Sequence, residues 1–111
     1  RPELLAYSMA AAAMDQMTRS LALALAPKGI RVNAVAFGSV MSASLRAALK
    51  DQPDYRDLIV AGTPMNRIAA PAEVAEAVQF LASDAAGFIT GQVLAVDGGR
   101  SLMDAVAAPA H

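Results

Sequence analysis

The sequence has no cysteine and a single histidine, and these two scarcities exclude several kinds of site. Without cysteine, the chain can form neither a disulfide framework nor a thiolate metal site. The one histidine, His111, cannot build an imidazole cluster for zinc or supply a serine-type triad. We therefore expect no metal in this chain.

The net charge is also small, and the sequence has no long apolar run. Nine Lys and Arg against ten Asp and Glu give a formal net charge of -1, which provides no electrostatic surface for nucleic acid or an anionic membrane. The longest run without a charged residue, residues 32–45, has 14 residues, whereas a membrane-spanning helix needs roughly 20 apolar ones. No secretory signal opens the chain, so a cytoplasmic protein is expected. The absence of an initial methionine leads us to expect a chain that begins in mid-protein.

The first half of the sequence contains a helical pattern followed by a strand pattern. Apolar residues in residues 4–26 recur at alternating spacings of four and three residues, which predicts a helix with one apolar stripe. The stripe consists of Ala10, Met14, Met17, Leu21 and Ala24. Pro27 ends the helix, and residues 30–36, rich in β-branched side chains, predict a buried strand. A helix, a tight turn and a buried strand in succession are typical of a parallel sheet.

The rest of the chain adds helices and one more strand. Helices are predicted at residues 44–50, 53–61 and 71–82, a strand at 92–96 and a turn at 97–99, and the tail from Arg100 is predicted to fray. This makes two strands and about four helices. Because a parallel sheet must be covered on both faces and is rarely stable with two strands, we expect the chain to belong to a larger α/β domain. A missing segment or a second chain would complete it.

Several short motifs narrow this fold class. They are YSMAAAA from Tyr7, APKGIRVN from Ala26, PAEVA from Pro71, ITG from Ile89 and VDGG from Val96. In this order and spacing, the chain resembles the second half of a short-chain dehydrogenase/reductase. The resemblance implies that residues 1–111 are the carboxyl-terminal half of one NAD(P)-binding Rossmann domain with a doubly wound parallel sheet. The family's glycine-rich turn and its catalytic Ser and Asn precede the tyrosine helix, so the missing amino-terminal half is an expected partner.

The same resemblance implies a catalytic tyrosine. In the family, the tyrosine of a Tyr-x-x-x-Lys motif exchanges a proton with the substrate oxygen, and Tyr7 matches this tyrosine. A phenol titrates near about 10 and needs a neighbouring positive charge to act near neutrality. The lysine position, one helical turn later, is Ala11. The implied activity is the interconversion of a small-molecule alcohol and a ketone or other carbonyl, and Ala11 predicts that this activity is strongly reduced.

A cofactor contact is implied in the loop after the first strand. Phe37, Gly38, Val40 and Ser42 stand at positions that the family uses on the nicotinamide side of NAD or NADP. Phe37 replaces a common proline and could offer an aromatic wall, and Ser42 replaces a common threonine and keeps a hydroxyl. The alternative is an ordinary connection from strand to helix, with Ser44 as the N-cap.

Further expectations concern the substrate side and the assembly. Residues 44–65 resemble the family's variable substrate lid, although their apolar side chains could instead pack two helices against the body of the domain. Arg67 is expected in a structural salt bridge. The resemblance also implies a homotetramer or homodimer, and it leaves NAD or NADP open because the discriminating residues precede Tyr7.

Three functions are therefore compatible with the sequence. The first is an NAD(P)-dependent oxidoreductase that is impaired by Ala11. The second is a catalytically silent relative that keeps the fold for cofactor binding or assembly. The third is a fragment with no function of its own.

Overall fold

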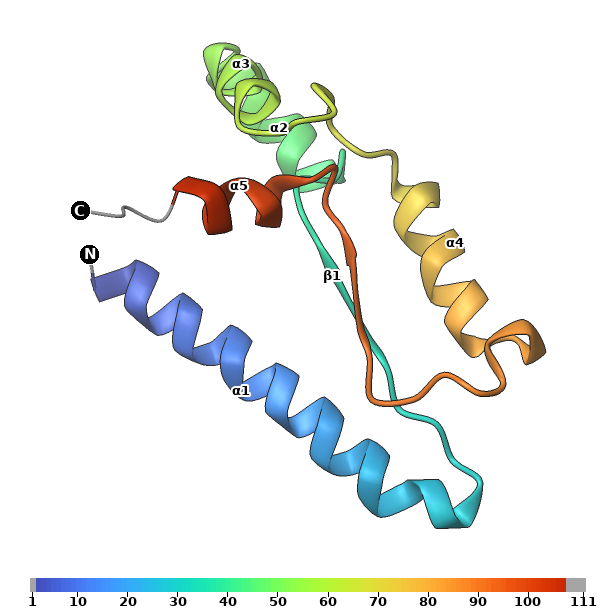
Figure 1. Cartoon of the computed structure of the whole chain (residues 1–111). Helices are drawn as coiled ribbons and strands as arrows, with labels where there is room; N and C mark the ends of the chain where they lie inside the picture. Colours follow the sequence, from blue (N-terminus) through green and yellow to red (C-terminus); the bar gives the residue numbers. More distant parts are fainter. Residues whose placement is uncertain (1, 108–111) are drawn as a thin grey trace. The chain divides into compact units, whose positions relative to one another are not determined.

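The computed structural model describes the backbone of residues 2–107 and the side chains of residues 9–103. Helices dominate, and two short strands form a sheet (Figure 1). In chain order the elements are α1 (Pro2–Leu25), the 3-10 helix η1 (Ala26–Lys28), β1 (Ala34–Phe37), α2 (Ala43–Asp51), α3 (Asp54–Ala61), α4 (Pro71–Ala82), the 3-10 helix η2 (Asp84–Ala86), β2 (Val93–Val96) and α5 (Arg100–Ala107). The α/β class is confirmed, and each predicted helix and strand overlaps an observed one; residues 2–107 hold five α-helices in place of about four.

These elements group into two compact units. One unit comprises the residues up to Val35 together with Phe80–Leu94, and it holds α1, η1 and η2. The other comprises Ala36–Gln79 and the chain from Ala95 onward, and it holds α2, α3, α5 and most of α4.

The two strands pair in parallel. The backbone N–H of Ala34 donates to the carbonyl of Gln92 at 2.9 Å, and that of Gly38 donates to the carbonyl of Val96 at 3.3 Å. In both bonds the acceptor lies 58 positions after the donor. A constant offset of this kind is the register of a parallel pair.

β1 begins four residues later than the predicted strand, because the preceding backbone is bonded elsewhere. Val32 donates its N–H to the Thr90 hydroxyl at 3.0 Å, and its carbonyl accepts from the Gly91 N–H at 2.7 Å. The Asn33 amide donates to the carbonyl of Ile89 and accepts from the N–H of Gln92, both at 3.0 Å. These bonds hold residues 32–33 against the segment that leads into β2, but they are not a strand ladder.

The apolar stripe of α1 is not covered by the part of the chain that the structure describes. Met14, Met17 and Leu21 are exposed, and the two buried residues on the described part of the helix are Thr18 and Ala22. The hydroxyl of Thr18 donates a hydrogen bond to the carbonyl of Met14 at 2.8 Å, which satisfies this polar group within the helix. The apolar stripe is thus present in the sequence, but the part of the chain that the structure describes does not cover it.

The prediction that the tail frays from Arg100 is wrong for residues 100–107, which form α5, and its remaining part, residues 108–111, lies outside the described residues. Asp97 starts this helix: its carboxylate accepts hydrogen bonds from the N–H groups of Gly99 at 3.0 Å and Ser101 at 2.9 Å. Such bonds satisfy donors that have no partner within the first helical turn. Hydrogen bonding from Ser101, by its side chain and then its backbone, lowers the pKa of Asp97, as does the bond from Gly99.

Candidate functional site

The predicted catalytic position lies in α1. Tyr7 and Ala11 both belong to this unbroken helix, so they are separated by one turn as predicted. The side chain of Tyr7 lies outside the described residues. Ala11 is exposed and carries only a methyl group. Beyond Tyr7, the next cationic residue along α1 is Arg19.

The predicted cofactor loop is held by Ala69, which lies two residues before α4. The N–H of Ala69 donates to the carbonyl of Ser39 at 3.1 Å, and the N–H of Met41 donates to the carbonyl of Ala69 at 2.9 Å. These two bonds form an isolated parallel bridge between Val40 and Ala69. In a bridge of this kind, the central residue directs its own N–H and carbonyl to the opposite side.

Val40 is therefore left with an unused backbone donor. Its carbonyl accepts from the N–H of Ser42 at 2.7 Å, but its own N–H has no hydrogen-bond partner among residues 2–107. The residue is half-buried. Buried backbone donors are nearly always paired, so this N–H is a natural point for a ligand acceptor.

The other three predicted cofactor residues differ in which of their groups could still contact a ligand. Phe37 ends β1 with 58% of its surface exposed, so its ring is accessible. Gly38 uses its N–H in the sheet. Ser42 is the N-cap of α2, where its hydroxyl accepts from the N–H of Leu45 at 3.2 Å. Ser42, and not Ser44 as predicted, therefore starts this helix.

A cavity of about 330 Å³ lies beside this loop, within the second unit. It is lined by Ser39, Thr63, Met65, Arg67, Ala69, Glu73 and residues 95–99. Thr63 and Met65 belong to residues 44–65, the segment that resembles the substrate lid; the sequence did not predict that they line this wall together with the 97–99 turn, although the glycines of that turn were a signal. Gly98 has a φ of +62°, and a Cβ there would lie 2.8 Å from the side chain of Thr63. Glycine thus allows the turn to approach the Thr63 segment.

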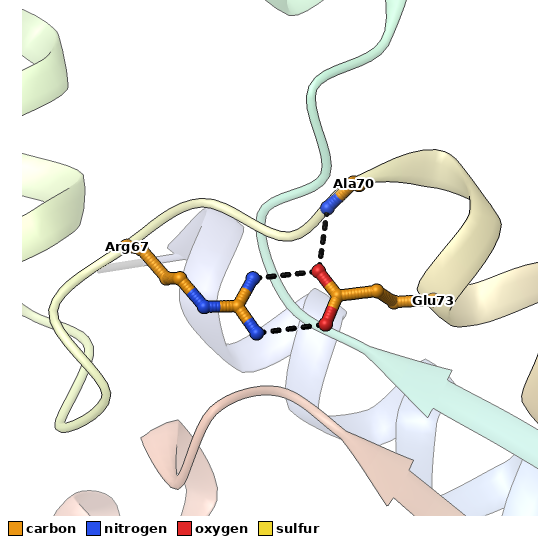
Figure 2. Close-up of polar contacts among 3 residues, drawn as sticks. All are labelled: Arg67, Ala70 and Glu73. Atoms are coloured by element: carbon orange, nitrogen blue, oxygen red, sulfur yellow. Dashed lines mark hydrogen bonds and ion pairs between the residues drawn. The ribbon is translucent and has the colours of Figure 1, made fainter.

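The predicted salt bridge of Arg67 is confirmed (Figure 2). Arg67 and Glu73 both line the same cavity. The guanidinium makes two parallel bonds to the Glu73 carboxylate, at 2.6 and 2.7 Å. Glu73 also accepts from the N–H of Ala70 at 2.9 Å, so it caps the start of α4. The bonds from Arg67 and then Ala70 lower the pKa of Glu73 to about 2. This pair fixes the segment containing Ala69, which in turn holds the loop at Val40.

The lowered pKa of Glu73 predicts a pH-dependent loss of stability. An unfolded glutamate titrates near 4.5, so the ion pair contributes fully above that pH and loses its contribution as the pH falls towards about 2. We expect the unfolding midpoint in denaturant to fall over this window, and to fall less steeply in Glu73→Gln. Both partners are partly exposed, so the effect is small.

The matched control is Glu76→Gln, which removes the same charge from the same helix without touching the ion pair. It should retain the native pH slope. An identical slope in native protein and Glu73→Gln would contradict the role assigned to this pair.

Comparison with known proteins identifies the family. The sequence profile described as Enoyl-(Acyl carrier protein) reductase matches residues 1–101. The chain is 52% identical, over 93 residues, to Cis-4-hydroxycyclohexanecarboxylate dehydrogenase of Sinomonas cyclohexanicum, covering 84% of this chain and 36% of that protein. The chain belongs to the short-chain dehydrogenase/reductase family.

Other members of the family agree in sequence and in structure. Galactitol 2-dehydrogenase (L-tagatose-forming) of Cereibacter sphaeroides is 42% identical over 103 residues, which cover 92% of this chain and 40% of that protein. The NADPH-bound structure of a short-chain oxidoreductase from Pseudomonas aeruginosa PAO1, containing an atypical catalytic center, matches with a TM-score of 0.76 at 36% identity. It covers 86% of this chain and 38% of that one. The chain thus spans between a third and two fifths of the length of these short-chain dehydrogenases/reductases.

Two absences complete the description of this family member. Among residues 2–107, no helix is both long and apolar enough to cross a membrane. The same described part of the chain contains no cluster of three or more His, Cys, Asp or Glu residues that could hold a metal ion.

Proposed function

We propose that this chain supplies the nicotinamide side and the catalytic tyrosine of an NAD(P)-dependent oxidoreductase that interconverts an alcohol and a carbonyl. Residues 1–111 would form the carboxyl-terminal half of its Rossmann domain, and an amino-terminal half would supply the remaining strands. The proposal includes a small-molecule alcohol or ketone substrate, a homodimer or homotetramer and a cytoplasmic location. The observation that carries it is the unused N–H of Val40.

The loop after β1 offers a backbone donor and an apolar ring, and both suit a nicotinamide cofactor. The N–H of Val40 would donate to a carboxamide oxygen, and the exposed ring of Phe37 would offer an apolar face. Gly38 and Ser42 would contribute by holding the loop, since the first is bonded to β2 and the second caps α2. When bound, the nicotinamide supplies or accepts the hydride. The NADPH in the matching Pseudomonas aeruginosa structure supports this choice of cofactor.

Tyr7 would hold and transfer the proton at its hydroxyl. Its helix lacks the cation that would lower the pKa of the phenol, because Ala11 occupies the position one turn later. We therefore propose a low rate of proton transfer near neutral pH.

The exposed apolar side chains support completion by further residues. Met14, Met17 and Leu21 form an uncovered row on α1, and Phe88 in the connection to β2 is fully exposed. Apolar surface of this extent normally marks a contact with another segment or chain. A two-stranded sheet also needs further strands to be stable.

The cofactor contact can be tested by titration. The native gene product, expressed at its full length, is titrated with NADH and NADPH while their fluorescence is recorded. Val40→Pro removes the N–H and is expected to weaken binding about tenfold, because a ligand acceptor loses its donor. Val40→Ala keeps the N–H and should bind within about twofold of the native protein.

Circular dichroism of both variants checks that they fold. Equal affinities of a folded Val40→Pro and the native protein would contradict the contact at Val40. Failure of the native protein to bind either nucleotide would contradict the whole proposal, and the intact mass of the same sample shows whether an amino-terminal half was present.

Ala11 also favours a second candidate, a silent relative that binds the cofactor without turnover. Loss of the family's lysine removes the activating charge but leaves the loop at Val40 intact. Nucleotide binding with no hydride transfer to any alcohol or ketone tested would identify this second function.

A further inference from the structure

A second hollow lies between α2 and α3, within the second unit and separate from the cavity beside Ser39. It has a volume of about 570 Å³, which is in the range of small-molecule sites. Its lining consists of Met41, Arg46, Leu49, Lys50, Pro53 and Arg56. We call it the α2–α3 hollow.

Local sequence explains why three cations meet in this place. Arg46, Leu49 and Lys50 are spaced by three and four residues, so they lie on one face of α2. α2 ends at Asp51, and Pro53 precedes α3, which begins at Asp54. The sharp connection brings Arg56, in the first turn of α3, to the same hollow.

The charge of these three residues is not compensated. Arg46, Lys50 and Arg56 are exposed, and none of them has an ion pair or a side-chain hydrogen bond within the part of the chain that the structure describes. The acidic residues of the same two helices do not line the hollow; they are Asp51, Asp54 and Asp57. Three unpaired cations around one concave surface raise the local concentration of anions.

The remaining lining is apolar. Met41 and Leu49 are half-buried, and Pro53 completes this part of the wall. A compact inorganic anion would gain nothing from such a surface, whereas an organic anion would bury its hydrocarbon part there. Arginine also suits carboxylates and sulfonates, because its planar fork matches two oxygens at once.

We propose that the α2–α3 hollow binds a small organic anion. Its acidic group meets Arg46, Lys50 and Arg56, and its hydrocarbon part packs on Met41, Leu49 and Pro53. Binding requires neither a nicotinamide nor Tyr7, so it is independent of the proposed oxidoreductase activity.

Benzoate is a suitable probe, with benzyl alcohol as its uncharged analogue and inorganic phosphate as the compact anion. In the native gene product labelled with methyl-¹³C methionine, we expect benzoate to shift the Met41 signal saturably. Met41→Leu assigns this signal. Benzyl alcohol and phosphate should each bind at least tenfold more weakly, because one lacks the charge and the other the apolar part. Added NaCl should weaken benzoate binding through screening.

Charge variants locate the site. The double variant Arg46→Gln with Arg56→Gln is expected to raise the dissociation constant of benzoate about tenfold, and Lys50→Gln about threefold. Arg19→Gln and Lys28→Gln remove matched exposed cations outside the hollow and should change it by less than about twofold.

Three results would overturn the proposal: native affinity in the double variant, equal affinity for benzyl alcohol, or equal affinity for phosphate. Failure of the oxidoreductase proposal is distinguishable, since it would remove nucleotide binding while the Met41 response to benzoate persisted.

Discussion

Replacing Ala11 with lysine is expected to raise the rate of alcohol oxidation by about a hundredfold or more near neutral pH, in the native gene product at its full length. α1 is continuous across Tyr7 and Ala11, so the new ammonium would lie one turn from the phenol. A positive charge at this distance lowers the pKa of a phenol towards neutrality. The pH at which the rate is half-maximal should therefore be lower in Ala11→Lys than in the native protein.

The matched control is Ala12→Lys, which adds the same charge to the same helix on a different face. It should leave the rate within about twofold of the native value. In the Ala11→Lys background, Tyr7→Phe should abolish the gain, since the phenol is the group that the lysine activates. Equal rates for native protein and Ala11→Lys would refute the role proposed for this position.

Replacing Arg31 with leucine is expected to lower the free energy of unfolding by about 3 kcal/mol. The half-buried guanidinium donates to three carbonyls: that of Leu81 at 2.7 Å, that of Ser83 at 3.2 Å and that of Ile89 at 3.3 Å. Leu81 lies in the last turn of α4 and Ser83 directly after the helix, where carbonyls lack partners within the helix and a positive charge is favourable. Leucine removes all three bonds and leaves the Leu81 carbonyl without its side-chain donor, whereas the Ser83 and Ile89 carbonyls keep bonds from the Ala86 N–H and the Asn33 amide.

Chemical denaturation of the full-length protein measures this effect. Arg31→Lys keeps the charge but not the planar fork, so it should lose about half as much free energy. Arg19→Leu, an exposed arginine without an ion pair in the described structure, should change the free energy by less than about 0.5 kcal/mol. A loss of the same small size in Arg31→Leu would contradict a stabilising role for the bonds from Arg31.

Local signals in the sequence predicted the helices well. Pro27 and Pro71 mark the end of one helix and the start of another, and the structure places both boundaries there. The ion pair of Arg67 was also predictable, since Glu73 lies in the first turn of the following helix and is only six residues away. These features depend on neighbours in the chain.

The sequence predicted three helix and strand boundaries incorrectly. Ser42 and Ser44 are both adequate N-caps, and only the bridge at Val40 places Ser42 at the start of α2. Strand β1 starts late because distant residues such as Thr90 take the backbone bonds of Val32. The start of α5 was not predicted, although the carboxylate of Asp97 accepts a hydrogen bond from the N–H of Ser101 in its first turn.

The sequence by itself determined the family, the order of helices and strands, and the presence of alanine at position 11, one helical turn after Tyr7, because each of these depends on residue identity and spacing. The tertiary structure alone decided that the N–H of Val40 has no partner within residues 2–107 and that three cations share one hollow. Both features depend on how segments far apart in the sequence turn and pair with one another, and no local sequence pattern specifies this.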